Sequence, residues 1–219
     1  MIDRVIPMWK PMEWTSFDVV RKIKNQIKPT KIGHAGTLDP FAEGVLLLCT
    51  GKKTKLIEHF MNEIKEYECE IILGSETDTL DLTGKVVKIS DVPIFDIKKI
   101  NNVLKQFQGK ILQEPPMYSA LKFNGIPLYK LARKGILIKR NKRVVNIYKI
   151  KLNSHTPNSI NITVQCGRGT YIRSLAKDIA ATLGTVAYLN KLKRTKVGNV
   201  DESACLTINE FPKWLSTKI

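Results

Sequence analysis

The chain has few of the residues that build disulfide frameworks or zinc sites. Its 219 residues include four cysteines and three histidines. No two cysteines form a C-x-x-C pair, and the histidines lie far from one another and from any cysteine. This scatter argues against a disulfide-stapled fold and against a zinc site built from neighbouring residues, because the spacings typical of both are missing.

Long apolar runs are missing as well. No stretch approaches the roughly 18 consecutive apolar residues of a membrane helix. The N-terminal sequence MIDRVIPMWKP has neither the basic segment and apolar block of a signal peptide nor a cleavage site. With 43% hydrophobic and 26% charged residues, the composition is that of a globular protein with one sizeable core. We therefore expect a cytoplasmic protein.

Acidic residues are absent from a long central block. Between Glu114 and Asp178, 63 positions hold 13 basic residues and no acid, in a chain of net charge +16. Such a block creates a positive field that suits a polyanion. The basic residues alternate with strand-like apolar ones and form no long amphipathic helix, which disfavours a membrane surface. Nucleic acid is the predicted partner.

Nucleotide-binding and nucleophile motifs are also absent. Gly51-Lys52-Lys53-Thr54, preceded by Gly44, has neither the glycine spacing of a P-loop nor a Ser or Thr directly after Lys52. We interpret this segment as a turn into a helix. The acidic run from Glu76 to Asp81 lacks the ligand periodicity of a calcium loop, and we interpret it as a polar turn between strands.

The spacing of apolar residues predicts an α+β protein with a large, mainly antiparallel sheet. Predicted helices cover residues 16–27, 53–61, 96–107, 128–134, 170–183 and 207–215. Predicted strands cover residues 45–49, 67–74, 85–89, 118–123, 143–152, 160–166 and 186–192. No linker is long enough to separate independently folded domains, although two lobes beside a cleft fit the pattern.

The segment from Gly33 to Leu46, GHAGTLDPFAEGVL, is suited to presenting the carboxylate of Asp39. Its glycines permit backbone geometries that side chains would block. Pro40 fixes its own φ angle and disfavours helical geometry at Asp39. Taken alone, the same pattern also describes an ordinary Asx-type turn.

Three further segments carry candidate residues. The turn Gly167 to Arg173 contains two arginines and opens a helix, where an anion is favoured by free amides and the helix dipole. Arg173 can point from there at an acid of another element, although an ordinary surface arginine fits equally. The segment Met117 to Lys122 contains Tyr118, and Tyr67 begins a predicted strand, where an aromatic residue usually packs in a core.

Together these segments resemble the TruB-type pseudouridine synthases, which isomerise the uridine at position 55 in the T arm of transfer RNA. The matching motifs occur in the family's order between Lys10 and Leu192. They are Lys10-Pro11, Gly33 to Pro40 with Gly44, Tyr67, Met117 to Lys122, Gly169 to Arg173, and Tyr188-Leu189. The resemblance implies a pseudouridine synthase fold, with a large mixed sheet flanked by helices and a central active-site cleft.

The resemblance also implies roles for single residues. Asp39 would be the nucleophile, and Arg173 would keep it ionised and fix its direction. Tyr67 would stack on the target base and assist in removing the C5 proton. Leu189 would line the pocket, and His34 would occupy the space left by the flipped base. The reaction needs no cofactor or metal.

Further predicted RNA contacts are Lys10, Lys122, Tyr118 and Arg168. The acid-free block would track the phosphates of the tRNA T arm, with binding that weakens as salt rises. RNA shape and splayed bases would supply the specificity.

We expect a catalytic domain over residues 1–205, with two lobes around the cleft, and a short C-terminal helix or tail over residues 206–219. A separate C-terminal RNA-binding (PUA-like) domain is not expected. The predicted protein is a stand-alone monomeric enzyme without an obligatory protein partner. Two alternatives are a non-catalytic RNA-binding or RNA-folding protein on the same scaffold, and a synthase that acts on another RNA.

Overall fold

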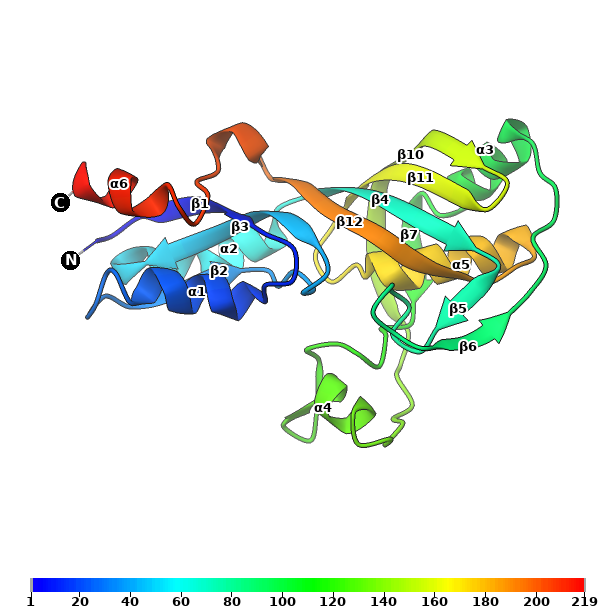
Figure 1. Ribbon diagram of the computed structural model, residues 1–219, viewed down its shortest axis with the longest axis horizontal. Coiled ribbons are helices and arrows are strands. Elements are labelled where there is room, and N and C mark those ends of the chain that lie inside the picture. The colour runs from blue at the N-terminus through cyan, green and yellow to red at the C-terminus, as the bar shows by residue number, and fades with distance from the viewer. Residues whose placement is uncertain (1, 219) are drawn as a thin grey trace. The chain divides into compact units, whose positions relative to one another are not determined.

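The structure, a computed structural model, describes residues 2–218 and divides into two compact units (Figure 1). The first unit comprises Met1–Glu68 and Leu192–Ile219, and the second comprises Cys69–Lys191.

The sheet of the first unit is built around a strand that is buried on both faces. Its strands include β1 (Val5–Lys10), β2 (Ile32–Ala35), β3 (Glu43–Thr50), the end of β12 (Ala187–Val197) and β13 (Val200–Asp201). β1 and β2 pair antiparallel with β3, whereas β12 runs parallel to it, with Arg194 opposite Gly44. Leu46 and Leu48 of β3 join one apolar cluster and Val45 and Leu47 join another, so its apolar run is continuous rather than alternating.

Helices cover this sheet. The α1 helix (Ser16–Lys24) begins with a capping box between Thr15 and Asp18 and packs Val19, Val20 and Ile23 into the cluster that contains Leu46. The other elements are η1 (Gly51–Leu56), α2 (Ile57–Asn62), η2 (Glu202–Ala204) and α6 (Phe211–Ser216).

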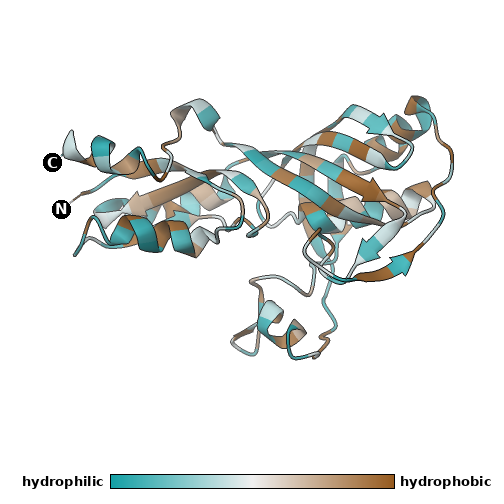
Figure 2. Ribbon diagram, viewed as in Figure 1, coloured by the Kyte–Doolittle hydropathy of each residue, from teal (hydrophilic) through white to brown (hydrophobic). Residues whose placement is uncertain are grey.

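The second unit contains a sheet in the order β4, β11, β10 and β7. These strands are β4 (Lys65–Leu73), whose first residues belong to the first unit, β11 (Ser159–Cys166), β10 (Arg143–Thr156) and β7 (Gly109–Gln113). The α3 helix (Ile97–Gln106) contacts both β10 and α5 (Ile172–Leu183). Eight residues of α5 are buried, of which six are apolar and two, Arg173 and Ser174, are polar, so both colours occur along this helix (Figure 2).

Two small hairpins complete the second unit. The first pairs β5 (Ser75–Thr77) with β6 (Val86–Ile89). The second pairs β8 (Lys122–Phe123) with β9 (Ile126–Pro127), and α4 (Leu128–Ala132) follows it. Asn124 and Gly125 have positive φ angles in the two-residue turn between β8 and β9, as this tight hairpin turn requires.

The predicted α+β class, with a large mixed sheet flanked by helices, is confirmed. Across the chain the strand order is β1-β3-β12-β4-β11-β10-β7, and β4 and β12 contribute residues to both units. Within residues 2–218 no helix is long and apolar enough to cross a membrane.

Several predicted boundaries were wrong. The predicted strand 118–123 shrinks to Lys122–Phe123, because Pro115 and Pro116 have no N–H groups to donate to a sheet and the next residues bend. The predicted helix 16–27 ends at Lys24, and the predicted helix 207–215 begins only at Phe211. The predicted helix 53–61 starts as the 3-10 turn η1, so the interpretation of Gly51 to Thr54 as a turn into a helix is confirmed.

All four cysteines are free thiols. Cys49, Cys69 and Cys166 are buried, and Cys205 is partly buried. Burial raises the pKa of Cys49 and of Cys205 to about 11, and it also raises the pKa of Cys69.

Candidate active site

Asp39 lies in the turn that connects β2 to β3 in the first unit. Gly36 (φ 92°) begins this turn, and the amide of Ala42 donates to the carbonyl oxygen of Asp39 over 3.1 Å. Gly44 (φ 124°) follows the turn, and the main chain of Arg194 occupies the space that a Cβ atom would need there. The need for glycine at both positions is therefore confirmed.

The turn is tied to the segment around the start of α1. The Ser16 hydroxyl accepts from the Leu38 amide over 2.9 Å and donates to the Leu38 carbonyl over 3.3 Å. On the other side of Asp39, the carbonyl of Pro40 accepts from the Glu13 amide over 2.8 Å. Both neighbours of Asp39 are thus held through their main chains.

Lys10, the last residue of β1, is fully buried under the same turn. Its Nζ donates to the carbonyls of Pro11, Trp14 and Pro40 over 2.9, 2.6 and 3.3 Å. Burial lowers the pKa of Lys10 to about 8, the negative charge of Asp39 opposes this shift, and the positive charge of Arg194 adds to it. The Lys10 ammonium and the Asp39 carboxylate therefore interact electrostatically.

His34 and Tyr67 lie on strands of this unit. His34 pairs with Leu48 between β2 and β3 and is partly buried. Burial is the main cause that lowers the pKa of His34, and the positive charge of Arg194 lowers it further. The ring is therefore neutral at pH 7. Its Nδ1 has no hydrogen-bond partner among residues 2–218. Tyr67 follows Lys65 in β4, and the Lys65 ammonium donates to three carbonyls at the end of α2.

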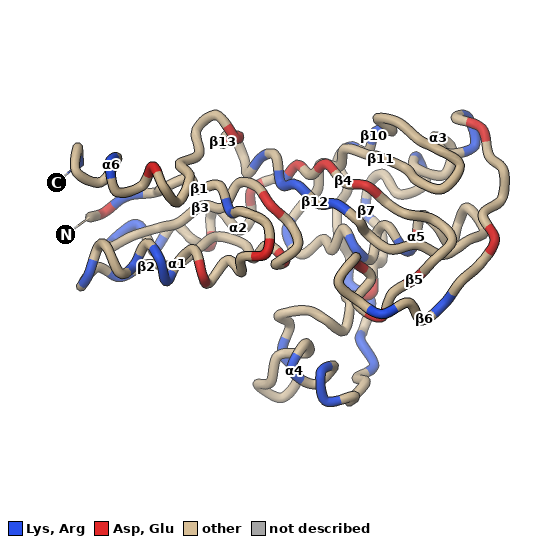
Figure 3. Tube along the Cα trace, in the orientation of Figure 1, with Lys and Arg blue, Asp and Glu red and all other residues tan. Residues whose placement is uncertain are grey.

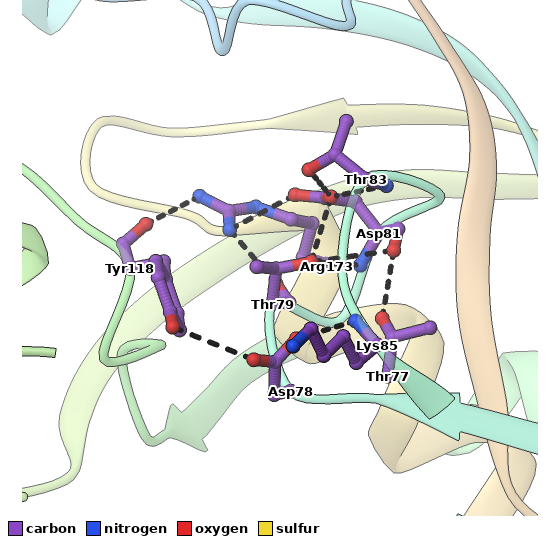
Figure 4. A network of polar contacts seen from close by, with 8 residues as sticks. All are labelled: Thr77, Asp78, Thr79, Asp81, Thr83, Lys85, Tyr118 and Arg173. Carbon is purple, nitrogen blue, oxygen red and sulfur yellow. Dashed lines mark hydrogen bonds and ion pairs between the residues drawn. The ribbon is translucent and has the colours of Figure 1, made fainter. Parts of the chain in front are cut away.

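Arg173, in the first turn of α5, is buried in the second unit. Its Nη1 donates to the Thr79 carbonyl over 2.9 Å and forms an ion pair with Asp81 Oδ2 over 3.2 Å. Its Nη2 donates to the Tyr118 carbonyl over 2.8 Å (Figure 4). An acid of another element, Asp81, thus faces Arg173.

Asp81 was not among the predicted site residues. Asp81 ends the acidic run that was interpreted only as a polar turn, yet it is buried and its Oδ1 accepts three hydrogen bonds. The donors are the Thr79 hydroxyl and the amide and hydroxyl of Thr83, at 2.8, 3.0 and 2.6 Å (Figure 4). The spacing Thr-x-Asp-x-Thr could have indicated the role of Asp81, because it favours turns in which an aspartate accepts hydrogen bonds from neighbouring residues.

The same turn holds Leu189. The Leu189 amide donates to the Leu80 carbonyl, and its carbonyl accepts from the Leu82 amide, each over 3.0 Å. The Leu189 side chain is fully buried. Leu189, Asp81 and Arg173 therefore share one network in the second unit.

Tyr118 belongs to this network through its main chain. Its hydroxyl also donates to Asp78 Oδ2 over 3.4 Å. Burial raises the pKa of this hydroxyl, and the negative charge of Asp78 raises it further. Lys122 on β8 and Arg168 in the turn before α5 are exposed, so their charges are accessible to a polyanion.

Exposed cations are concentrated in the segment from Lys122 to Arg143, which surrounds α4 (Figure 3). Its exposed basic residues are Lys122, Lys130, Arg133, Lys134, Lys139, Lys142 and Arg143. Arg140 differs, because it is partly buried and bonded to Glu114 and to the Pro115 carbonyl. Among residues 2–218, no group of three His, Cys, Asp or Glu residues converges on a metal position.

Two family patterns match this chain. Residues 24–172 match the pattern described as "TruB family pseudouridylate synthase (N terminal domain)". Residues 173–218 match that described as "tRNA pseudouridylate synthase B C-terminal domain".

Curated relatives cover most of the chain. The tRNA pseudouridine synthase B of Clostridium acetobutylicum is 45% identical over 96% of this chain and 72% of its own length. The protein of the same name from Clostridium tetani is 48% identical over 89% of this chain and 68% of its own length. The tRNA pseudouridine synthase B of Bordetella avium is 43% identical over 95% of this chain and 86% of its own length.

Solved structures with the same fold include chains of larger complexes. A chain of a Cbf5-Nop10-Gar1 complex superposes with a TM-score of 0.74 and 30% identity over 98% of this chain. A chain of an H/ACA RNP bound to a substrate RNA containing 2'-deoxyuridine superposes with a TM-score of 0.71 and 28% identity over 98% of this chain. This chain spans 56% and 55% of those two chains.

Proposed function

The chain belongs to the TruB family of pseudouridylate synthases, and from this membership we propose that it isomerises uridine to pseudouridine at position 55 in the T-arm loop of tRNA. The observation that carries the proposal is the 45% identity to a tRNA pseudouridine synthase B over nearly the whole chain. We further propose residues 1–205 as the catalytic domain.

The proposed reaction conserves atoms and electrons within the nucleotide. The N1–C1′ bond breaks, the uracil rotates, and a C5–C1′ bond forms, while C5 loses a proton and N1 gains one. We propose that Asp39 is the nucleophile, with its covalent bond to either the base or the sugar carbon. The bonds to Leu38 and Pro40 support this role, because a nucleophile on a fixed main chain loses little freedom when it reacts.

We propose Arg173 as the cation that orients the nucleophile. Its three partners within the second unit, Asp81 and the carbonyls of Thr79 and Tyr118, hold the planar guanidinium in one direction. This fixed direction supports an orienting role, since a mobile surface arginine would offer none.

The remaining proposed roles concern the target base. Tyr67 stacks on it and assists in removing the C5 proton, Leu189 forms an apolar wall, and His34 fills the space that the flipped base leaves. The lowered pKa of His34 supports this last role, because a neutral ring is cheaper to place within a base stack. For Lys10, whose donors all meet main-chain carbonyls, we propose support of the turn rather than RNA contact.

The decisive experiment incubates the protein with an unmodified tRNA transcript and maps pseudouridine at single-nucleotide resolution. Modification at position 55 alone is expected. Modification of other RNAs but not of tRNA would identify a synthase with a different substrate. Tight tRNA binding without any pseudouridine would identify an RNA-binding protein and overturn the enzymatic proposal.

The Asp39→Asn variant tests the nucleophile. Its side chain is nearly isosteric but cannot form the covalent intermediate, so pseudouridine formation should be abolished while tRNA affinity changes by no more than a few-fold. Filter binding and the mapping assay measure the two quantities on one preparation. Retained turnover would show that Asp39 is not the nucleophile.

A further inference from the structure

Arg194, which no motif in the sequence singled out, is one of the most deeply buried side chains of the first unit. Only 1% of its surface is exposed, although arginine is rarely buried to this degree without a carboxylate partner. It lies on β12 opposite Gly44, where the two main chains approach too closely for any side chain at Gly44. Its guanidinium is therefore directed from β12 into the first unit beside the Asp39 turn.

The guanidinium bonds to both ends of that turn. Its Nε donates to the carbonyl of Val45 over 2.7 Å, and its Nη2 donates to the carbonyl of Gly36 over 3.1 Å. Gly36 precedes Asp39 and Val45 follows it. A single planar group thus fixes the separation between the two strands from which the Asp39 turn emerges.

The position is electrostatically costly. Arg194 is close enough to lower the pKa of two basic residues of this unit, Lys10 and His34. Like charges near each other in a buried environment oppose folding, and an apolar side chain of similar size is often at least as stable in such a place. Stability alone is therefore a poor explanation for a cation here.

We propose that Arg194 is a positioning residue for the reaction, which acts through the main chain of Gly36 and Val45 to hold the Asp39 carboxylate in its reactive place. This inference rests on the proposed function for its catalytic part. Its structural part, control of the turn from Gly36 to Val45, is independent of any activity.

Three variants test the proposal. Arg194→Met keeps the bulk but removes both hydrogen bonds and the charge. Arg194→Lys keeps the charge, but a single ammonium cannot reproduce the planar fork that reaches both carbonyls. Lys196→Met, at an exposed position on the same strand, is the matched control.

Hydrogen exchange of the intact protein, followed in peptides that cover residues 36–45, measures the turn directly. Arg194→Met should exchange there about tenfold faster than the wild type, and Lys196→Met should match the wild type. Unchanged exchange in Arg194→Met would overturn the proposal. If Arg194→Met does not fold, the same measurement is made on Arg194→Lys. Exchange at the wild-type rate in residues 36–45 of Arg194→Lys would then overturn the proposal.

Single-turnover assays on the tRNA transcript measure the catalytic part. Arg194→Met should lose about 100-fold in rate, as expected for a misplacement on the scale of 1 Å, and Arg194→Lys should recover part of the loss. The affinity for tRNA should change by no more than about threefold. If folded Arg194→Met reacts at the wild-type rate, the proposal for Arg194 is overturned. If the wild-type protein is itself inactive, the proposed function is overturned, and hydrogen exchange alone then tests whether Arg194 holds the turn.

Discussion

Lys10 and Arg194 are two of the buried cations of the first unit that donate to main-chain carbonyls, and no carboxylate pairs directly with either in the described residues. A carbonyl satisfies an N–H donor but neutralises no charge, so each cation retains part of its desolvation cost. At the scale of single residues, the unit that contains Asp39 therefore holds two cations without a directly paired carboxylate, and protonation of Lys10 is linked to folding.

The linkage predicts a pH effect on stability. Lys10 has a pKa of about 8 in the folded state against 10.5 in a free chain, so the unfolded chain binds the proton more tightly between these values. Stability from this site is therefore lowest below pH 8 and rises with pH up to 10.5. Relative to Lys10→Met, the wild type should gain about 3 kcal/mol of unfolding free energy across this window.

Urea titrations of both proteins between pH 7 and 10.5 give that difference, in which the titration of all other lysines cancels. A difference that is independent of pH, or that falls as pH rises, would show that burial does not dominate the proton affinity of Lys10.

The turn that holds Asp39 was predictable, because glycines and a proline in one short segment carry it. Partners from distant segments were not. Asp81 was placed in a turn by its neighbours, and no local pattern connects it to Arg173. The resemblance implied that Lys10 contacts RNA, whereas the structure buries it fully, which is rare for lysine. Arg194 lies on a strand whose alternation places its side chain inward, but no pattern indicates which carbonyls it meets.

At the scale of elements, most helices and strands were predictable from their periodicity, and the failures have local causes. β1 was missed because Pro7 interrupts its pattern, which an edge strand tolerates. The segment after Pro116 resembles a strand by composition, but its main chain bends and serves Arg173 through the Tyr118 carbonyl. Pairings between distant strands, such as β3 with β12, leave no periodic signal in either strand.

The β3–β12 pairing predicts an unequal response to alanine at two glycines. Gly44 and Gly109 both have positive φ angles, but only at Gly44 does a neighbouring main chain occupy the Cβ position. Gly109→Ala should lose about 1 kcal/mol through backbone strain alone. Gly44→Ala should lose about 3 kcal/mol or more, because strands β3 and β12 must also separate.

Denaturation of the two variants under identical conditions measures the difference. Equal losses would mean that the main chain of β12 moves aside at little cost, which would also weaken the argument for a fixed Arg194.

At the scale of the whole molecule, the net charge of +16 is unevenly distributed, with the exposed cations of residues 122–143 surrounding α4 (Figure 3). The proposed RNA contact in this segment predicts that the triple variant Lys134→Glu, Lys139→Glu and Lys142→Glu weakens tRNA binding more than tenfold. The slope of log affinity against log salt should also become shallower by about 1 for each lost phosphate contact.

The control carries the same change of net charge on α3, at Lys98, Lys99 and Lys105, which are also exposed. Filter binding at several salt concentrations compares the two triple variants. Equal effects would mean that net charge alone governs affinity and that the α4 segment has no special place in binding.

The reactivity of the four buried or partly buried thiols reports the unfolding of each unit. Cys49 and Cys205 belong to the first unit, whereas Cys69 and Cys166 belong to the second. A thiol reacts with alkylating reagents as the exposed thiolate, which burial suppresses. Pulse alkylation followed by peptide mapping therefore reports, without any engineered label, whether the two units unfold in one cooperative event or one after the other.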